Sequence, residues 1–238
     1  MFGFKSYANS VVTIYTEQFP PYNFSNKGQL QGINLDFVRQ LCKQTNIDCQ
    51  FKLLPWSRSY RLTLEQPLSG LISTARTDER EELFQWIGPL VSSRNYFYRM
   101  HNNNHINPTQ LSELKNYTLG VIRDSVYEAV IEDLGFITDK NVLKFSHHYE
   151  YINLFFKNKL DLIIGSELSL YYQLQQYGYS SENVVRLLEL PLSTPTGNYL
   201  ALNKQMPAEL VARLQIAFAK LVAEGALEQH KNTYFKGE

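Results

Sequence analysis

The chain has 238 residues, enough for one large α/β domain or for two smaller lobes that each bury a hydrophobic core. Its 23 Lys and Arg residues balance its 23 Asp and Glu residues, and no basic stripe indicates a nucleic-acid surface. No segment approaches the ~18–20 consecutive apolar residues of a membrane-spanning helix, whereas 16 Tyr and 14 Phe supply the flat side chains typical of cores and ligand pockets.

The first part of the chain alternates strand and helix signals. β-branched residues predict a strand over 11–16, and apolar residues at helical spacing predict a helix over 33–45. Strands are expected over 49–55 and 70–74, and the segment 56–66 between them is typical of a helix. A β-α-β-α-β order of this kind favours a mainly parallel sheet with helices on both faces.

A second set of alternating signals follows a segment rich in Tyr, Phe and Asn at 92–108. Ser125 is placed to cap the first helix of this set, and Gly135 is placed to end it. The set predicts a second α/β unit. Its strands are expected over 117–122, 141–145, 160–165 and 183–188, and its helices over 125–135, 148–159 and 166–178.

The C-terminal residues 207–235 predict two helices and no strand. Helices without a sheet of their own must pack on an existing lobe, and a return to the first lobe is the simplest solution. We therefore expect an α/β fold of two lobes, each a mixed, mainly parallel sheet flanked by helices, with a cleft between them. The expected boundaries are 1–95 and 197–238 for lobe 1, 96–196 for an inserted lobe 2, and two hinge crossings near 94–100 and 192–200.

Two cysteines, Cys42 and Cys49, stand at the end of a predicted helix and the start of a predicted strand. That geometry could bring their Cα atoms within the ~4.4–6.8 Å of a disulfide, and the short loop would gain roughly 2–3 kcal/mol. The alternative is two free buried thiols. A disulfide would favour an oxidising compartment. The first residues lack the apolar core of an export signal, so the protein is either exported with its signal removed or cytoplasmic. The cysteine spacing does not fit a zinc site.

Polar and aromatic side chains follow each predicted strand of lobe 1. Ligands of open α/β sheets bind outside the carboxyl ends of the strands. Arg80, just past the third strand, has the planar guanidinium that binds a carboxylate through two parallel hydrogen bonds. The alternative is an ion pair with an acidic neighbour on the surface. The other candidates are Phe19 and Tyr22 after the first strand, Trp56 and Arg58 after the second, and Ser73 and Thr74 after the third.

The second unit offers polar side chains at two strand-to-helix turns. Arg123, Asp124 and Ser125 form the first turn, and the amides of a helix N-terminus bind anions. Ser166 or Glu167 begins a helix at the second. Glu167 could receive a ligand ammonium or hydroxyl group, or it could simply complement the helix dipole. These turns are expected to face the cleft.

The usual enzyme motifs are absent from the sequence. It contains no G-x-S-x-G, no P-loop, no G-x-G-x-x-G and no H-E-x-x-H. The adjacent His147 and His148 are typical of a solvated helix start. The residues therefore favour binding of a small molecule over catalysis, with no cofactor and no metal.

Several segments, in order, resemble the family 3 periplasmic solute-binding proteins, the polar amino-acid receptors of ABC importers. The resemblance implies a two-lobed fold that closes on its ligand by hinge motion. The cysteine pair matches a disulfide of the basic-amino-acid receptors of that family. The segments are VVTIYTEQFPPYNF (11–24), GQLQGINLDFVRQLC (28–42), GLISTARTDERE (70–81), GPL (88–90), YTLGVIRDSVYE (117–128) and KLDLIIGSE (159–167).

The resemblance also implies roles for single residues. Arg80 matches the arginine that binds the ligand α-carboxylate. Ser166 stands where amino-acid receptors carry an Asp for the α-ammonium group, and Asp124 replaces a Gly of the second lobe's carboxylate-binding turn. With Arg58 and Arg76 nearby, these departures favour a more anionic ligand than an ordinary α-amino acid. The remaining matches are Phe19 or Tyr22 and Trp56 as aromatic walls, Ser73 and Ala75 at hydroxyl positions (the hydroxyl being lost at Ala75), and Ser125 and Val126 at the second lobe's turn.

The leading hypothesis is a periplasmic protein that captures a small polar, carboxylate-bearing, amino-acid-like ligand and delivers it to an ABC permease. It is expected to act as a monomer and without nucleic acid. The alternatives are a ligand-sensing module of a signalling system and a dehydratase-type enzyme on the same fold, with Glu17 or Glu167 as its acid or base. The expected ligand-binding residues are Glu17, Phe19, Tyr22, Trp56, Arg58, Ser73, Thr74, Ala75, Arg80, Arg123, Ser125, Val126 and Ser166.

Overall fold

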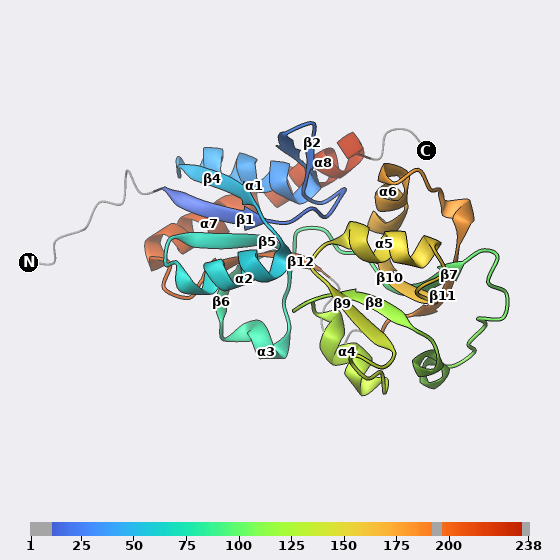
Figure 1. Cartoon of the computed structure of the whole chain (residues 1–238). Coiled ribbons are helices and arrows are strands. Elements are labelled where there is room, and N and C mark those ends of the chain that lie inside the picture. Colours follow the sequence, from blue (N-terminus) through green and yellow to red (C-terminus); the bar gives the residue numbers. More distant parts are fainter. Residues whose placement is uncertain (1–10, 192–196, 235–238) are drawn as a thin grey trace, which may run out of the picture.

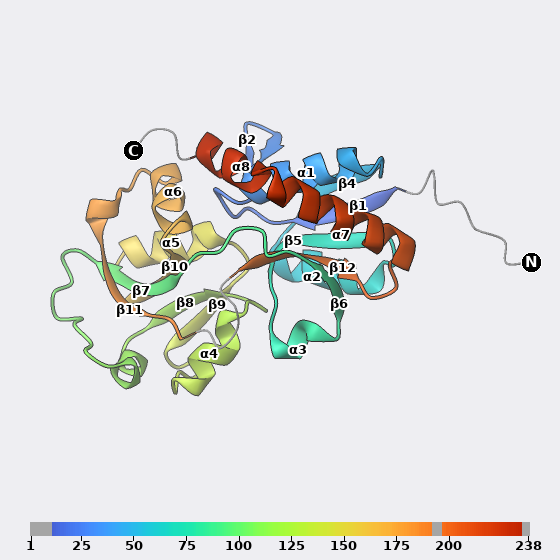
Figure 2. The same cartoon turned by 180° about the vertical axis from the view of Figure 1, so that it is seen from behind.

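The computed structural model describes residues 11–191 and 197–234, which form two lobes side by side (Figures 1 and 2). Each lobe is built on a five-stranded sheet with helices on its faces. We call the lobe that contains both ends of the described chain lobe 1, and the other lobe 2. This confirms the expected α/β fold with two mixed sheets.

Lobe 1 has the strand order β4-β1-β5-β12-β6. The first three strands are parallel, and β12 is antiparallel to both of its neighbours. Helices α1, α7 and α8 lie on one face of the sheet and α2 on the other (Figure 2). The strands are β1 (Val12–Thr16), β4 (Cys49–Leu53), β5 (Ser69–Ala75), β6 (Phe84–Ile87) and β12 (Asn198–Asn203); the helices are α1 (Ile33–Gln44), α2 (Trp56–Glu65), α3 (Asp78–Glu81), α7 (Ala208–Ala223) and α8 (Ala226–Tyr234).

Lobe 2 has the strand order β11-β7-β10-β8-β9. Strand β8 is parallel to β9 and β10, whereas β7 is antiparallel to β10 and β11. Its elements are β7 (Asn95–Met100), β8 (Leu119–Ile122), β9 (Val142–Phe145), β10 (Leu162–Ser166), β11 (Val184–Glu189), α4 (Tyr127–Asp133), α5 (His148–Phe156), α6 (Ser169–Gln176) and the 3₁₀ turns η1 (Leu111–Asn116) and η2 (Ser181–Asn183). In lobe 1, a small hairpin of β2 (Phe24–Asn26) and β3 (Gln29–Gln31) lies between β1 and α1 in the chain.

Two segments connect the sheets and run beside each other. The Leu90 N–H donates to the Asn198 carbonyl at 2.6 Å, and the Asn198 N–H donates to the Val91 carbonyl at 3.0 Å. The Leu190 N–H donates to the Asn95 carbonyl at 2.8 Å. The first crossing thus precedes β7, earlier than the 94–100 expected, and residues 192–196 of the second lie outside the described residues. The exact lobe boundaries stay a prediction.

The loop after β1 is fixed on the first turn of α1. The Tyr22 carbonyl accepts hydrogen bonds from the amides of Asn34 and Leu35 at 2.9 and 3.2 Å. Gly32, with φ 134°, makes this approach possible, because a Cβ there would lie 2.5 Å from the Tyr22 carbonyl oxygen. The apolar face of α1 is buried against the sheet, so the loop that carries Glu17, Phe19 and Tyr22 rests on the lobe 1 core.

Cys42 and Cys49 form a disulfide with their Cα atoms 6.2 Å apart. It ties the end of α1 to the start of β4, as the sequence predicted. No helix within the described ranges is both long and apolar enough to span a bilayer.

Candidate ligand-binding site

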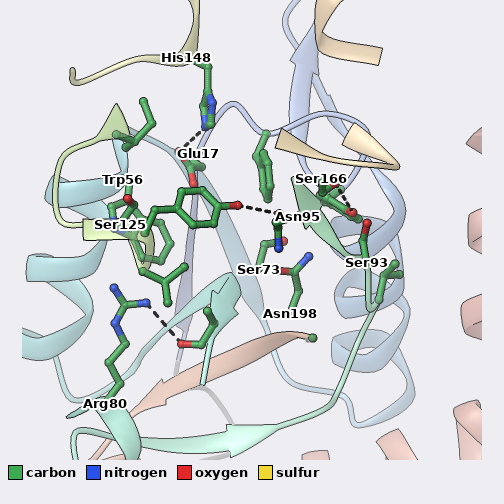
Figure 3. A pocket seen from close by; sticks show the side chains of 18 residues that line it. Glu17, Trp56, Ser73, Arg80, Ser93, Asn95, Ser125, His148, Ser166 and Asn198 are labelled. Atoms are coloured by element: carbon green, nitrogen blue, oxygen red, sulfur yellow. Dashed lines mark hydrogen bonds and ion pairs between the residues drawn. The ribbon is translucent and has the colours of Figure 1, made fainter. Parts of the chain in front are cut away.

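A pocket opens between the two lobes (Figure 3). The space inside it is about 790 Å³ when the part open to solvent is included. Residues of lobe 1, of lobe 2 and of the two crossings line it. They are Glu17, Phe19, Tyr22, Trp56, Ser73, Ala75 and Arg80; Ile122, Ser125, Val126, Tyr127, His148 and Ser166; and Val91, Ser93, Asn95, Gly197 and Asn198.

Three expected site residues lie elsewhere. Thr74 is fully buried and donates its hydroxyl to the Leu71 carbonyl at 3.1 Å, because side chains alternate along β5 and Thr74 takes the face opposite to Ser73. Arg58 is exposed on α2, and Arg123 is exposed beside the pocket. The other ten line the pocket; whether they bind a ligand stays a prediction.

Two further residues of the sequence argument are engaged outside the pocket. The Arg76 guanidinium holds Glu81 through two hydrogen bonds of 2.6 and 2.5 Å, which lowers the pKa of the Glu81 carboxyl group. Glu167 lies 3.9 Å from Arg186. Neither Arg76 nor Glu167 lines the pocket, so neither adds charge to its wall.

Arg80 points into one end of the pocket from α3 (Figure 3). Its Nη2 donates to the Asp124 carbonyl of lobe 2 at 3.0 Å, and its Nη1 donates to the Ala75 carbonyl at 3.4 Å. The rings of Trp56 and Tyr60 lie 5.6 and 5.2 Å from its guanidinium carbon, which orients the cation. Burial lowers the pKa of Arg80, but a guanidinium remains charged in proteins. These two hydrogen bonds use two of the five N–H donors of the guanidinium.

The turn before α4 joins lobe 2 to lobe 1. The Asp124 carbonyl accepts a hydrogen bond from Trp56 Nε1 at 2.8 Å as well as the one from Arg80. Ser57 Oγ donates to the Arg123 carbonyl at 3.2 Å. Asp124 adopts φ 58°, which turns its carbonyl toward lobe 1. The two lobes are therefore in contact at the Arg80 end of the pocket.

The expectation that Ser125 caps a helix over 125–135 is wrong. The helix begins at Tyr127, because the Ser125 amide closes a turn on the Ile122 carbonyl at 3.2 Å. The Glu128 carboxylate accepts the Asp124 amide at 2.6 Å and satisfies the turn instead. Ser125 Oγ is buried, lines the pocket and has no hydrogen-bond partner within the described structure. A buried hydroxyl without a hydrogen-bond partner lowers the stability of the folded protein unless a ligand or a water molecule bonds to it.

Ser73 is held by a chain of hydrogen bonds in lobe 1. Asn23 Nδ2 donates to the Glu17 carbonyl at 2.9 Å, so its Oδ1 faces Ser73 and accepts the Ser73 hydroxyl proton. Asn34 Nδ2 then donates to Ser73 Oγ at 2.8 Å. Since the Ser73 proton is committed, the hydroxyl offers the pocket only a lone pair. Ser73 Oγ can therefore accept a hydrogen bond on the pocket side but cannot donate one.

The hydrogen-bonding capacity of the Ser166 hydroxyl is taken up by other groups of the protein. It donates to Ser169 Oγ at 2.8 Å and accepts the Ser169 amide at 2.9 Å. With that proton engaged, the Tyr22 hydroxyl, 3.1 Å away in lobe 1, donates to Ser166 Oγ. Burial raises the pKa of Tyr22, so it keeps its proton for this bond. The position at which the resemblance places an Asp for an ammonium group is here a hydroxyl pair that links the lobes.

Glu17 and His148 meet at the other end of the pocket (Figure 3). His148 Nε2 lies 3.7 Å from Glu17 Oε2, and the His148 ring stacks on Phe19 with centroids 5.5 Å apart. Tyr127 donates its hydroxyl to Asn95 Oδ1 at 2.9 Å nearby. Within the described ranges, no group of three or more His, Cys, Asp or Glu side chains could hold a metal ion.

Eight lining residues were not predicted from the sequence. Ser93 lies on the first crossing, and Asn95 and Asn198 are the first residues of β7 and β12; their polar side chains could have been nominated because the chain passes the floor of the cleft there. His148 was interpreted as part of a solvated helix start, and no local pattern distinguishes it from His147. The others are Val91, Ile122, Tyr127 and Gly197.

The fold and the pocket between its sheets are those of a two-lobed binding protein. Residues 11–237 match the family model of bacterial extracellular solute-binding proteins, family 3. The match spans nearly the whole chain, so the chain belongs to that family. A comparison with curated proteins gave no match.

Several solved structures share the fold. An ancestral arginine-binding protein bound to arginine has 20% identity and a TM-score of 0.80, with 96% of this chain and 99% of the other covered. A histidine kinase sensor domain with similarity to periplasmic binding proteins has 16% identity and a TM-score of 0.83, with 95% and 96% covered. The arginine-, lysine-, histidine-binding protein ArtJ from Geobacillus stearothermophilus has 17% identity and a TM-score of 0.78, with 95% and 96% covered.

Proposed function

We propose that this protein is a periplasmic solute receptor that captures a small polar, carboxylate-bearing, amino-acid-like ligand between its lobes. In this proposal the monomeric receptor presents the ligand to the permease of an ABC importer and does not convert it. Family membership supports a binding role, and several structural relatives are by name amino-acid-binding proteins.

The observation that carries the ligand class is the pairing of Arg80 with Ser125 at one end of the pocket. Arg80 reaches across the cleft to the carbonyl of Asp124, the residue before Ser125, so its guanidinium and the unpartnered Ser125 Oγ are neighbours from opposite lobes. A carboxylate bound there would accept charge-assisted hydrogen bonds from Arg80 and a hydrogen bond from the Ser125 hydroxyl. Because Ser125 Oγ is buried and Arg80 is partly buried, both contacts are stronger than in bulk water.

The acceptors lie on the remaining wall. Ser73 presents only a lone pair, and Glu17 adds a carboxylate at the far end of the pocket. A ligand with a carboxylate at one end and hydrogen-bond donors along its length matches this distribution. An α-amino acid has that pattern, with its ammonium group directed to Ser73 and not to Ser166.

The test is a thermal-shift screen of amino acids and small organic acids, followed by calorimetry on the ligand that raises the melting temperature most. Arg80→Ala should lower the affinity for that ligand by about 10- to 100-fold, since hydrogen bonds to charged groups contribute about 1.5–3 kcal/mol. Arg58→Ala is the matched control, because Arg58 is exposed and outside the pocket. Equal affinities of the Arg80 variant and the wild type would refute the assigned carboxylate site.

A sensing role is the second candidate, because a histidine kinase sensor domain has the same fold. The two roles differ in the partner of the ligand-bound form. Reconstitution with the permease and ATPase of an importer should give ligand-dependent ATP hydrolysis if the protein is a transport receptor. Ligand-dependent phosphorylation of a histidine kinase, without any effect on the transporter, would favour the sensor instead.

A further inference from the structure

The charged groups that line the pocket are few and lie far apart. Among the lining residues, Arg80 is the only Lys or Arg and Glu17 the only Asp or Glu. Figure 3 shows them at opposite ends of the pocket. A ligand held by Arg80 therefore directs its far end toward Glu17, and the state of Glu17 decides which far ends fit.

Glu17 is not free to receive that far end. His148, at the start of α5 in lobe 2, brings its Nε2 to 3.7 Å from Glu17 Oε2. Both side chains are largely buried, with 14% of His148 and 13% of Glu17 exposed. His148 Nδ1 is 2.7 Å from the Tyr151 hydroxyl, and its ring lies parallel to Phe19, with 7° between the planes. Contacts from both lobes thus hold the imidazole against the carboxylate.

Glu17 and His148 line the pocket and also a second hollow, which we call the outer hollow. His147 and Tyr149 line only the outer hollow. The titratable groups that face His148 are Glu17 from lobe 1, Tyr151, His147 and Tyr149 from its own helix start, and Tyr177 after α6. Glu17 is the only Asp, Glu, Lys or Arg among the residues that line the outer hollow.

We propose that His148 is a specificity-determining residue. It pairs with the Glu17 carboxylate and so disfavours ligands with a positively charged far end. The inference rests on the proposed function and narrows its ligand class. A guanidinium or ammonium group at the far end would have to displace the imidazole from Glu17 to pair with the carboxylate. A far end that is neutral and polar, such as a carboxamide, does not need that carboxylate for an ion pair.

The experiment compares the affinities for L-glutamine and L-arginine by calorimetry. The wild type should prefer L-glutamine. His148→Asn should move the affinity ratio toward L-arginine by about tenfold. Adding Glu17→Gln to His148→Asn should cancel the gain. His147→Asn is the matched control, since the neighbouring histidine does not line the pocket.

The outcomes separate the two proposals. An unchanged ratio in both His148→Asn and His148→Gln, with L-glutamine still bound, overturns the role of His148 and leaves the proposed function standing. Wild-type protein that prefers L-arginine overturns it as well. Wild-type protein that binds neither an amino acid nor a small organic acid contradicts the proposed function, and this inference falls with it.

Discussion

The two walls of the pocket differ in how firmly their own lobes hold them. On the lobe 1 wall, Ser73 is bonded to Asn34 and Asn23, and Arg80 is stacked on aromatic rings of α2. On the lobe 2 wall, Ser125 Oγ has no partner within the described structure, and His148 reaches Glu17 of lobe 1.

This difference assigns different tasks to the walls. Groups that are fixed in advance lose little freedom when a ligand binds, so the lobe 1 wall is preorganised for its share of the contacts. On the lobe 2 wall, Ser125 keeps hydrogen-bonding capacity that no group of the described structure uses. Matched substitutions on the two walls should therefore separate stability from affinity.

Ser73→Ala should have the largest effect on stability. It leaves the Asn34 amide and the Asn23 carbonyl oxygen without their partner in a buried network, so the free energy of unfolding should fall by about 2–3 kcal/mol without ligand. Urea denaturation of the ligand-free protein measures this loss. A change below about 0.5 kcal/mol would show that the lobe 1 wall is not held as described.

Ser125→Ala is the matched change on the lobe 2 wall and should affect affinity alone. The Ser125 hydroxyl makes no hydrogen bond in the described structure, so its loss should leave the free energy of unfolding unchanged or slightly higher. Ligand affinity should fall about five- to tenfold, the value of one hydrogen bond of about 1–1.4 kcal/mol. Calorimetry and urea denaturation of the same variant test both statements, and a loss of stability without a loss of affinity would reverse the comparison.

His230 provides the smallest effect and a baseline away from both walls. It packs on Phe37 in lobe 1, and its Nε2 is 2.8 Å from Gln40 Oε1. Burial lowers the pKa of His230, so the unfolded chain takes up this proton at a higher pH than the folded one. Its contribution to stability is complete above the ordinary histidine pKa of about 6.5 and is lost as the pH falls through that value.

His230→Gln should remove this part of the pH dependence. The difference in the free energy of unfolding between about pH 8 and about pH 5.5 should be smaller in the variant than in the wild type. Ligand affinity should not change, because His230 does not line the pocket. An identical pH dependence in the two proteins would contradict the effect of burial on this group.

The fold was predictable because its elements carry local signals. The spacing of apolar residues in α1 and the β-branched run of β1 indicate a helix and a strand, and their alternation indicates parallel sheets. The same logic placed Arg80 and Ser73 at the end of β5, where they line the pocket. These inferences hold because the carboxyl ends of parallel strands meet at one edge.

The lobe 2 wall was harder to predict, because chain topology and not local sequence brings its groups to the pocket. Ser125 has the spacing of a helix cap, yet Glu128 satisfies the turn and leaves the serine hydroxyl to the pocket. His148 gains its partner from a loop more than a hundred residues earlier in the chain. Neither pairing has a signature at the level of residue type.

The paired crossings have a mechanical consequence. A single connecting strand would leave each lobe free to bend and to twist about the connection. Here Leu90, Val91 and Asn198 bond one crossing to the other, so twist would have to shear these hydrogen bonds whereas bending would not. A change in the angle between the lobes that keeps these hydrogen bonds is therefore a bend and not a twist, and such a bend would bring Glu17 back to His148 in the same alignment.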